Sequence, residues 1–204
     1  IVCGGRTVDS KPFSVQVRKP TEQRLITFQS GIDGSIQYYA LRPAIPADGN
    51  IKGLPLILSI HGAGVEGSGQ AAAYSSKPWC NLIAATNRRP FGFDWEDWGR
   101  LDAIEVLDHA TDLLNPDPRR VYLTGHSMGG HGTWQIGAHF AGRFAAIAPS
   151  AGWISFWSYS GAAAYEGGTP IENILRRAAS PSDTLALKSN YLQQGVYILH
   201  GDAD

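Results

Sequence analysis

The stretch Val121-Tyr122-Leu123-Thr124-Gly125-His126-Ser127-Met128-Gly129-Gly130 decides the fold of this 204-residue chain. A short run rich in β-branched and aromatic residues leads into the pattern Gly-x-Ser-x-Gly, and residues 128–140 then predict a helix. In this pattern the serine sits on a sharp strand-to-helix turn, so the residues two positions away must be small. Gly125 and Gly129 meet that need. The stretch therefore predicts a nucleophile elbow that exposes Ser127 at the carboxyl edge of a sheet. The alternative is an ordinary glycine-rich turn.

Segments on both sides of the elbow predict the rest of the sheet. Residues 24–41 alternate in polarity around the turn Gly31-Ile32-Asp33-Gly34, which predicts a β-hairpin. The apolar run 55–60 has no polar face, which is typical of a strand buried on both sides in a parallel sheet. Apolar residues at helical spacing predict a helix over 101–114. Buried strands are also predicted at 82–85, 144–148 and 196–199, and a helix at 171–179 within an insertion over 155–192.

Buried strands that alternate with amphipathic helices predict the α/β class. The expected architecture is a doubly wound, mostly parallel sheet with an N-terminal hairpin. Together with the serine elbow, this order of elements is the pattern of an α/β-hydrolase fold. We expect residues 1–23 to be a linker or the edge of a preceding domain, and residues 24–204 to be the hydrolase domain without its C-terminal part.

The segment His61-Gly62-Ala63-Gly64 follows a predicted strand and supplies a candidate oxyanion hole. Acyl transfer needs donors aimed at the oxygen that becomes negative in the transition state. In this fold one donor is the backbone N–H after the nucleophile, here that of Met128. The second is assigned to Ala63, with Gly64 as the neighbouring alternative. His61 is expected to brace the loop by hydrogen bonding, and His126 to pack beneath the nucleophile.

The triad of this fold follows the chain order serine, acid, histidine. Asp204, three residues past the Gly201 that ends a predicted strand, is the predicted acid, and Asp202 is the alternative. The order then requires a histidine C-terminal to Asp204. The chain begins without methionine and stops directly after a strand-like run, so we expect a segment of a longer polypeptide. The segment alone should be nearly inactive, because it lacks the base that activates the serine.

Two aromatic-rich loops are expected near the site. Both follow predicted strands, at the edge where ligands bind in this architecture. Exposed rings there would suit stacking on a sugar or an aromatic acyl group, and Trp95, Trp153 and Trp157 are the candidates. The alternative is that these rings pack the loops onto the core. Residues 87–90 could bind a substrate carboxylate, although a structural salt bridge to nearby acids is the favoured reading.

Composition narrows the remaining possibilities. A hydrophobic fraction of 43% and a charged fraction of 17% indicate a globular domain. A formal net charge of −1, without a basic cluster, argues against nucleic-acid binding, and no transmembrane span is predicted. The histidines and cysteines show no recognised metal-ligand spacing, so no metal or cofactor is predicted. Cys3 and Cys80 could form one disulfide or stay as free thiols.

The motifs at 61–64, 117–130, 144–149 and 200–204 together resemble the prolyl oligopeptidase family of serine peptidases. The resemblance covers roughly residues 24–204. More specifically, the motifs resemble a bacterial single-domain branch of predicted peptidases, which grades into feruloyl and acetylxylan esterases and polyhydroxybutyrate depolymerases. It implies Ser127 as nucleophile, Asp204 as acid, Ala63 and Met128 as oxyanion donors, and a histidine several dozen residues downstream. It also favours a secreted or periplasmic location.

The resemblance implies a serine hydrolase that cleaves a small-molecule ester or a peptide through an acyl-serine intermediate. The family name favours a serine peptidase. A carboxylesterase acting on acyl groups of plant polysaccharides is the alternative, because family peptidases often carry an oxyanion-donating tyrosine where His61 stands here. An acyltransferase sharing the triad, and a non-catalytic binding module on the same fold, are the other classes.

Overall fold

The computed structural model describes residues 2–3, 5–7, 11–12, 14–155, 159 and 168–202. Its strands are β1 (Val2–Cys3), β2 (Arg6–Thr7), β3 (Arg24–Gln29), β4 (Ile36–Arg42), β5 (Leu56–Ile60), β6 (Asn81–Ala84), β7 (Val121–His126), β8 (Ala146–Ser150) and β9 (Gly195–Val196). Its α-helices are α1 (Gly67–Ala72), α2 (Asp97–Leu114), α3 (Met128–His139) and α4 (Pro170–Ala179). Short 3-10 helices are η1 (Ala141–Arg143), η3 (Ser180–Ser182) and η4 (Lys188–Gln193).

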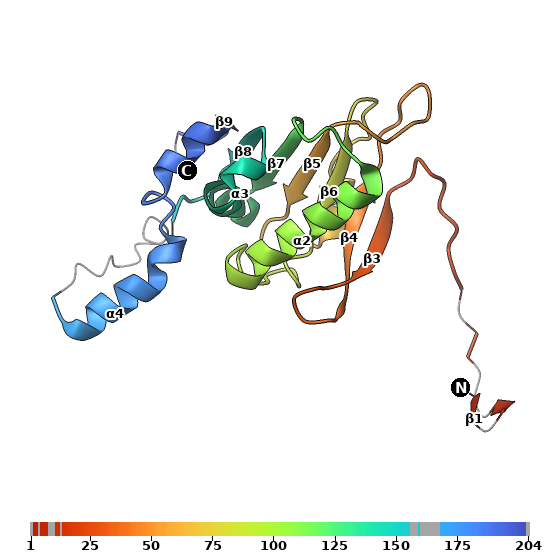
Figure 1. The fold of residues 1–204 in the computed structure, drawn as a ribbon, viewed down its shortest axis with the longest axis horizontal. Helices are drawn as coiled ribbons and strands as arrows, with labels where there is room; N and C mark the ends of the chain where they lie inside the picture. Colours follow the sequence, from red (N-terminus) through yellow and green to blue (C-terminus); the bar gives the residue numbers. More distant parts are fainter. Residues whose placement is uncertain are drawn as a thin grey trace.

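Seven strands form the main sheet, in the order β3-β4-β6-β5-β7-β8-β9 (Figure 1). The β3–β4 hairpin is antiparallel and joins β6 antiparallel, whereas β6, β5, β7, β8 and β9 run parallel. The registers pair Ile60 with Gly125 and His126 with Ser150, so β5, β7 and β8 end level with one another. The predicted α/β class, the mostly parallel sheet and the N-terminal hairpin are confirmed.

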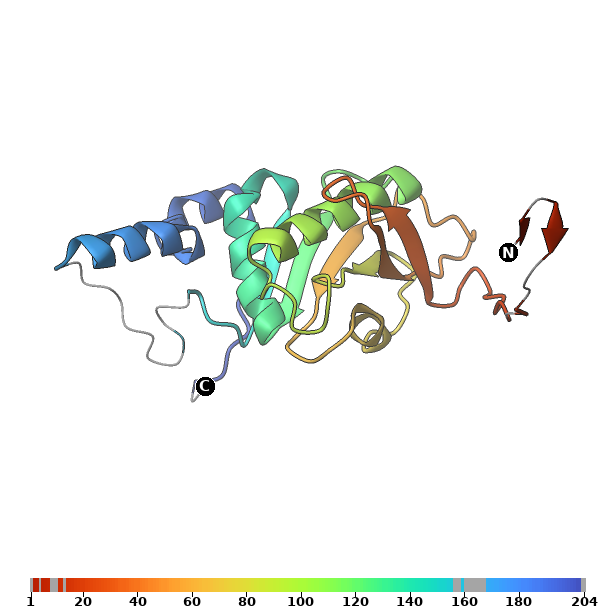
Figure 2. The same ribbon diagram turned by 90° about the horizontal axis from the view of Figure 1, so that it is seen from below.

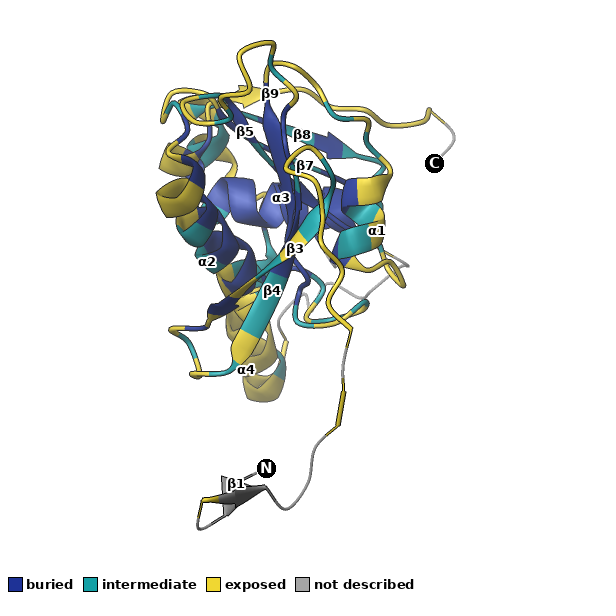
Figure 3. Cartoon of the chain, turned by 90° about the vertical axis from the view of Figure 1, so that its right-hand side faces the viewer, coloured by how far each residue is buried: buried dark blue, intermediate teal, exposed yellow. Residues whose placement is uncertain are grey.

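Helices cover both faces of the sheet, and Figure 3 shows α1 and α2 on opposite sides of it. The larger core joins strand residues such as Leu58 and Leu123 to Leu107 of α2 and Ile136 of α3. A smaller core under α1 contains Ala40, Ala71, Leu82 and Ala84. Burying a side chain of leucine size stabilises a fold by about 1.5–3 kcal/mol, so the α2–α3 face carries most of the hydrophobic stabilisation.

Helix α1 was not predicted, because its sequence Gly-Ser-Gly-Gln-Ala-Ala lacks an apolar helical pattern. The structure supplies the reason for its first glycine. A Cβ on Gly67 would lie 2.8 Å from the carbonyl oxygen of Ala85. The glycine therefore allows the helix to start in direct contact with the backbone that follows β6.

The predicted buried strand at 196–199 is wrong in its burial. Strand β9 is assigned to two residues only, although Tyr197 and Leu199 continue the ladder with N–H bonds to Ile147 and Pro149 of 2.9 and 3.1 Å. Residues 196–199 are 40–68% exposed. The cause is position, since β9 is the last strand and, within the residues described, nothing covers its outer side.

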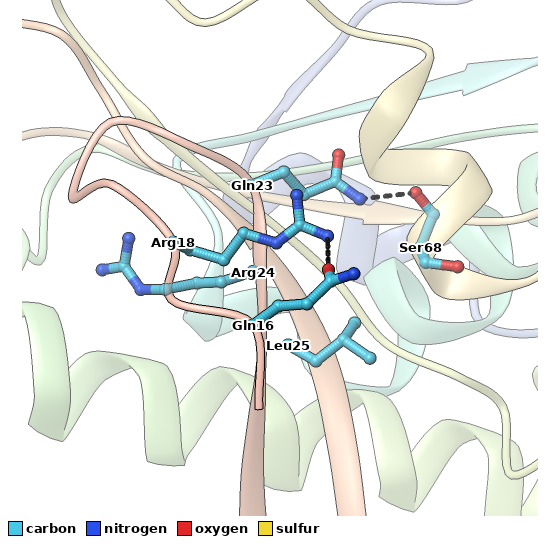
Figure 4. A pocket seen from close by; sticks show the side chains of 6 residues that line it. All are labelled: Gln16, Arg18, Gln23, Arg24, Leu25 and Ser68. Atoms are coloured by element: carbon cyan, nitrogen blue, oxygen red, sulfur yellow. Dashed lines mark hydrogen bonds between the residues drawn. The ribbon is translucent and has the colours of Figure 1, made fainter. Parts of the chain in front are cut away.

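The N-terminal segment and α4 extend from opposite ends of the sheet (Figure 2). Residues 14–19 have no regular secondary structure and are exposed. Gln16 and Arg18 line a surface pocket of about 600 Å³ together with residues 23–25 and Ser68, at the β3 end of the sheet (Figure 4). Within this pocket the Gln23 amide donates to the Ser68 carbonyl at 2.8 Å. The division at residue 23 stays a prediction.

Candidate active site

Ser127 sits at the tip of a strained turn between β7 and α3. Its φ of 58° and ψ of −121° lie in a region that side-chain-bearing residues rarely adopt. Two backbone bonds hold it there: its N–H donates to the Ser150 carbonyl at 2.9 Å, and its carbonyl accepts the His131 N–H at 3.0 Å. The geometry is that of the elbow predicted from the sequence, with Ser127 at the carboxyl edge of the sheet.

The glycines around Ser127 are required by close backbone contacts. A Cβ on Gly125 would lie 2.3 Å from the Gly129 carbonyl oxygen, and a Cβ on Gly129 would lie 2.2 Å from that of Ile60. A real Cβ does not approach backbone oxygen that closely, so either substitution forces the turn open. The sequence argument, that both residues must be small, therefore has a direct structural cause.

The structure brings the loop after β5 beside Ser127. A Cβ built on Gly62 would lie 3.6 Å from the Ser127 Cβ. The Gly64 N–H donates to the Pro90 carbonyl at 3.2 Å. Ala63 is exposed, and among the described residues its N–H donates no backbone hydrogen bond to another loop. Met128 begins α3, and a first-turn N–H has no acceptor within its helix. The two predicted oxyanion donors thus lie on the two segments that flank the serine.

His61 braces this loop, as predicted. Its side chain is fully buried, with Nε2 3.0 Å from the Thr86 carbonyl oxygen and Nδ1 3.0 Å from that of Gly62. Trp95 completes the support, because its indole N–H donates to the His61 carbonyl at 2.9 Å. The predicted stacking of Trp95 on a substrate is wrong: its side chain is 0% exposed, and the packing alternative describes it.

His126 differs from the expectation as well. It was predicted to pack beneath the nucleophile, yet it is exposed, with Nδ1 3.1 Å from the Ser150 hydroxyl. It is the last residue of β7, and its side chain faces away from the core that its neighbour Gly125 occupies. The hydrogen bonds of the ring nitrogens of His61, His109, His126, His131 and His139 lead to groups other than the Ser127 hydroxyl.

Trp153 is half-buried in the loop after β8. Its ring stacks on His131 at a centroid distance of 4.8 Å and on Tyr159 at 4.2 Å. His131 is itself fully buried, and its Nε2 lies 2.9 Å from Glu96 Oε1. The substrate role of Trp153 stays a prediction. Trp157 and Asp204 lie outside the described residues, and the alternative acid Asp202 is exposed.

The loop after β6 contains a buried charge cluster that the sequence only hinted at. Arg88, with a side chain 8% exposed, forms ion pairs with Asp102 at 2.9 Å, Glu105 at 3.2 Å and Asp33 at 3.4 Å. The salt-bridge reading of residues 87–90 is therefore confirmed for Arg88. Burial raises the pKa of Asp102 to about 6, and the Arg88 charge acts in the opposite direction. The cluster fixes the loop that passes beside residues 61–64.

Other candidate groups lie apart from this edge. In the part of the chain that the structure describes, no set of three histidine, cysteine or acidic side chains could hold a metal ion. Cys80 is a buried free thiol, and burial raises its pKa. Over the same residues, no helix has the length and hydropathy needed to cross a membrane.

The strained serine, its glycine contacts and the parallel sheet define an α/β-hydrolase of the serine hydrolase class. The chain belongs to the prolyl oligopeptidase family, which matches residues 87–204.

Individual proteins show the same relationship. The chain is 27% identical over 192 residues to an uncharacterized secreted protein of Arthroderma benhamiae, a match that covers 84% of this chain. It is 32% identical over 108 residues, 48% of its length, to the bifunctional acetylxylan esterase/xylanase XynS20E of Neocallimastix patriciarum. These matches cover only 20% and 16% of the two relatives, so the chain corresponds to a small part of each.

Solved structures share the fold at low identity. Dipeptidyl peptidase 4 of Porphyromonas gingivalis matches with a TM-score of 0.65 and 17% identity, over 90% of this chain and 28% of its own. The S-formylglutathione hydrolase FrmB of Staphylococcus aureus matches with a TM-score of 0.60 and 15% identity, over 89% of this chain and 80% of its own. Esterases and peptidases therefore share this fold, and the fold leaves the substrate class open.

Proposed function

We propose that Ser127 is the nucleophile of a carboxylesterase that acts through an acyl-serine intermediate. The observation that carries the proposal is the strained elbow, where Ser127 has a φ of 58° between glycines that no larger residue can replace. Such strain persists only where the surrounding structure holds it, and it clusters at active sites.

The chemistry follows from the positions of the groups. The Ser127 oxygen attacks the ester carbonyl carbon, and its proton passes to a histidine base. The N–H groups of Met128 and Ala63 donate to the oxyanion, a stabilisation worth about 3–4 kcal/mol for each donor. The bond to the alcohol then breaks, and the alcohol oxygen takes the proton from the histidine. Water repeats the sequence and releases the acid.

Two triad members in this proposal rest on chain order. Asp204 is proposed as the acid, and the base is proposed to be a histidine that follows Asp204 in the full-length polypeptide. The hydrogen bonds of His61, His109, His126, His131 and His139 support this assignment, because they lead to groups other than the Ser127 hydroxyl. Both assignments can be tested by substitution.

Ester cleavage is favoured over peptide cleavage by the state of His61. Family peptidases often carry an oxyanion-donating tyrosine hydroxyl at this position. Here the His61 side chain is fully buried, and both ring nitrogens face backbone carbonyl oxygens. It therefore offers no donor toward Ser127. The relative XynS20E is named an acetylxylan esterase/xylanase, which also favours ester cleavage. A serine peptidase is the second candidate function.

The test is hydrolysis of p-nitrophenyl acetate and of a prolyl-peptide anilide by the full-length polypeptide. Because a serine peptidase would also cleave this activated ester, the anilide separates the two functions: we expect the ester to be hydrolysed and the anilide to be left intact, and Ser127→Ala to lower kcat by roughly 10⁶-fold. Ser150→Ala is the matched control, since it removes the neighbouring hydroxyl and keeps the carbonyl that accepts the Ser127 N–H. Cleavage of the anilide would favour the peptidase, and a fully active Ser127→Ala variant would refute the assignment of Ser127 as the nucleophile.

A further inference from the structure

Phe91 is a large apolar side chain exposed beside the candidate oxyanion loop. The residue is 68% exposed, and it follows β6 at the same edge of the sheet as Ser127. Exposing a phenyl ring forgoes the stabilisation that burial would give, about 1.5–3 kcal/mol. Single exposed apolar side chains are common on protein surfaces, so the feature that sets Phe91 apart is its place beside the oxyanion loop.

Two contacts place Phe91 against the loop that flanks the serine. The Gly64 N–H donates to the Pro90 carbonyl at 3.2 Å, which ties the two loops together. A Cβ on Gly64 would lie 3.5 Å from Phe91 Cζ, so the ring tip lies over the Gly64 backbone. Gly62 in the same loop is the residue that approaches Ser127. A group bound at Ser127 and extending along this loop would reach the ring.

Buried polar side chains fix the backbone of the loop that carries Phe91. Asn87, 0% exposed, accepts the Phe93 N–H at 3.2 Å and donates to the Phe91 carbonyl at 3.3 Å. Asn87 and Arg88 both have positive φ, 53° and 66°, and Arg88 is anchored to the buried Asp102. These hydrogen bonds and the charge cluster thus fix the backbone that carries Phe91, as expected of a loop that presents a side chain from a preformed position.

The neighbouring rings of this loop already have partners. Phe93 lies 6.0 Å from Trp98, and the Arg89 guanidinium stands 5.5 Å from the Phe93 centroid. Within the residues the structure describes, Phe91 has no aromatic or guanidinium partner of this kind. Its face is therefore available to a ligand.

We propose that Phe91 is a specificity-determining residue that packs against an aromatic ring of the substrate ester. The proposal rests on the function proposed for Ser127 and adds the chemical class of the group beside it. The aromatic ring belongs to the acyl part or to the alcohol part of the ester, since either can extend along residues 62–64. Ring–ring contacts of this kind favour offset or edge-to-face geometry.

The experiment measures kcat/KM of the full-length polypeptide for two pairs of esters by titrating the released acid. The acyl pair is methyl 3-phenylpropanoate against methyl butanoate, and the alcohol pair is 3-phenylpropyl acetate against propyl acetate. The saturated spacer keeps the reactivity of each pair similar. We expect the phenyl ester to be preferred in one pair, and Phe91→Ala to lower that preference about fivefold. Phe91→Trp should keep it.

Trp79→Ala is the control. Trp79 is 52% exposed but precedes β6, at the opposite edge of the sheet, so its removal should leave both preferences unchanged. Unchanged preferences in Phe91→Ala, with all four esters hydrolysed, would overturn the assignment of Phe91 alone. A wild-type protein that hydrolyses none of the four esters would overturn the proposed function and this inference together.

Discussion

The two edges of the parallel sheet differ in which residues carry unusual backbone conformations. At the carboxyl edge, positive φ angles fall on Gly64 and Gly92 but also on several residues with side chains, among them Asn87, Arg88, Ser127 and Ala151. At the amino edge they fall on Gly49 and Gly53, which adopt them at little cost, and on Asn115, the left-handed cap that ends α2, where asparagine is tolerated. Glycine would relieve the strain at these positions of the carboxyl edge, yet the sequence keeps larger residues there. This points to a constraint other than stability.

The two edges also differ in how deeply their ion pairs are buried. Arg88 at the carboxyl edge is buried among three acids, whereas Arg120 before β7 pairs with Asp117 while 49% of its side chain is exposed. An exposed pair is worth about 0–1 kcal/mol, but breaking a buried pair costs about 3–5 kcal/mol. Removing the cation should therefore destabilise the protein more at the carboxyl edge, which contains Ser127, than at the amino edge.

The largest effect is expected from Gly129→Ala in the elbow. Its Cβ would meet the Ile60 carbonyl oxygen at 2.2 Å, between rigid backbone segments. We expect a loss of about 5 kcal/mol or more in the free energy of unfolding, measured by urea denaturation. Gly142→Ala is the control near the amino edge, because nothing lies within 4 Å of its Cβ position. Equal stability of the two variants would contradict the claim that close backbone contacts require glycine at position 129.

A smaller loss is expected when the buried cation is removed. Arg88→Met leaves Asp102 buried without its counter-charge and should cost about 3–5 kcal/mol, as followed by thermal and urea unfolding. Arg120→Met, the same substitution at the exposed pair, should cost about 1 kcal/mol or less. If both substitutions cost the same, the charge clusters at the two edges are equivalent and the comparison fails.

The pH dependence of stability gives a third, smaller effect. Burial raises the pKa of Asp102 to about 6, above its value of about 3.9 in the unfolded chain. Between these values the folded state binds more protons, so the Asp102 contribution to stability falls as pH rises from about 4 to about 6, by roughly 2–3 kcal/mol. Asp102→Asn should remove this decline in urea titrations at each pH.

Asp117 provides the opposite case at the amino edge. Hydrogen bonds from the Arg119 backbone lower the pKa of its carboxyl, so its contribution is lost as pH falls rather than as pH rises. Asp117→Asn should therefore leave the decline between pH 4 and 6 in place. A decline that survives in Asp102→Asn and disappears in Asp117→Asn would reverse the assignment.

The features that could be predicted from the sequence are those that depend on residues close together in the chain. The alternation over 24–41 and the elbow around Ser127 depend on neighbours a few residues away, and both formed as expected. The burial of Trp95 depends on a carbonyl 34 residues earlier in the chain, and the exposure of His126 on the Ser150 hydroxyl 24 residues later. No local pattern encodes such partners, so these two side chains were placed wrongly.

The charge cluster shows the same limit. The sequence indicated a salt bridge for the segment 87–90 but not which arginine was buried. Arg88 and Arg89 are adjacent, yet Arg88 contacts Asp102 while Arg89 stands over Phe93. Asn87 and Arg88 both have positive φ, and the sequence pattern does not predict that backbone path.

Active-site labelling tests the central claim most directly. The full-length polypeptide is treated with a fluorophosphonate, and the modified peptide is mapped by mass spectrometry. We predict one adduct, on Ser127, and none on the neighbouring Ser150. A folded polypeptide that gives no adduct, or that carries it on another serine, would contradict the assignment of Ser127 as the nucleophile.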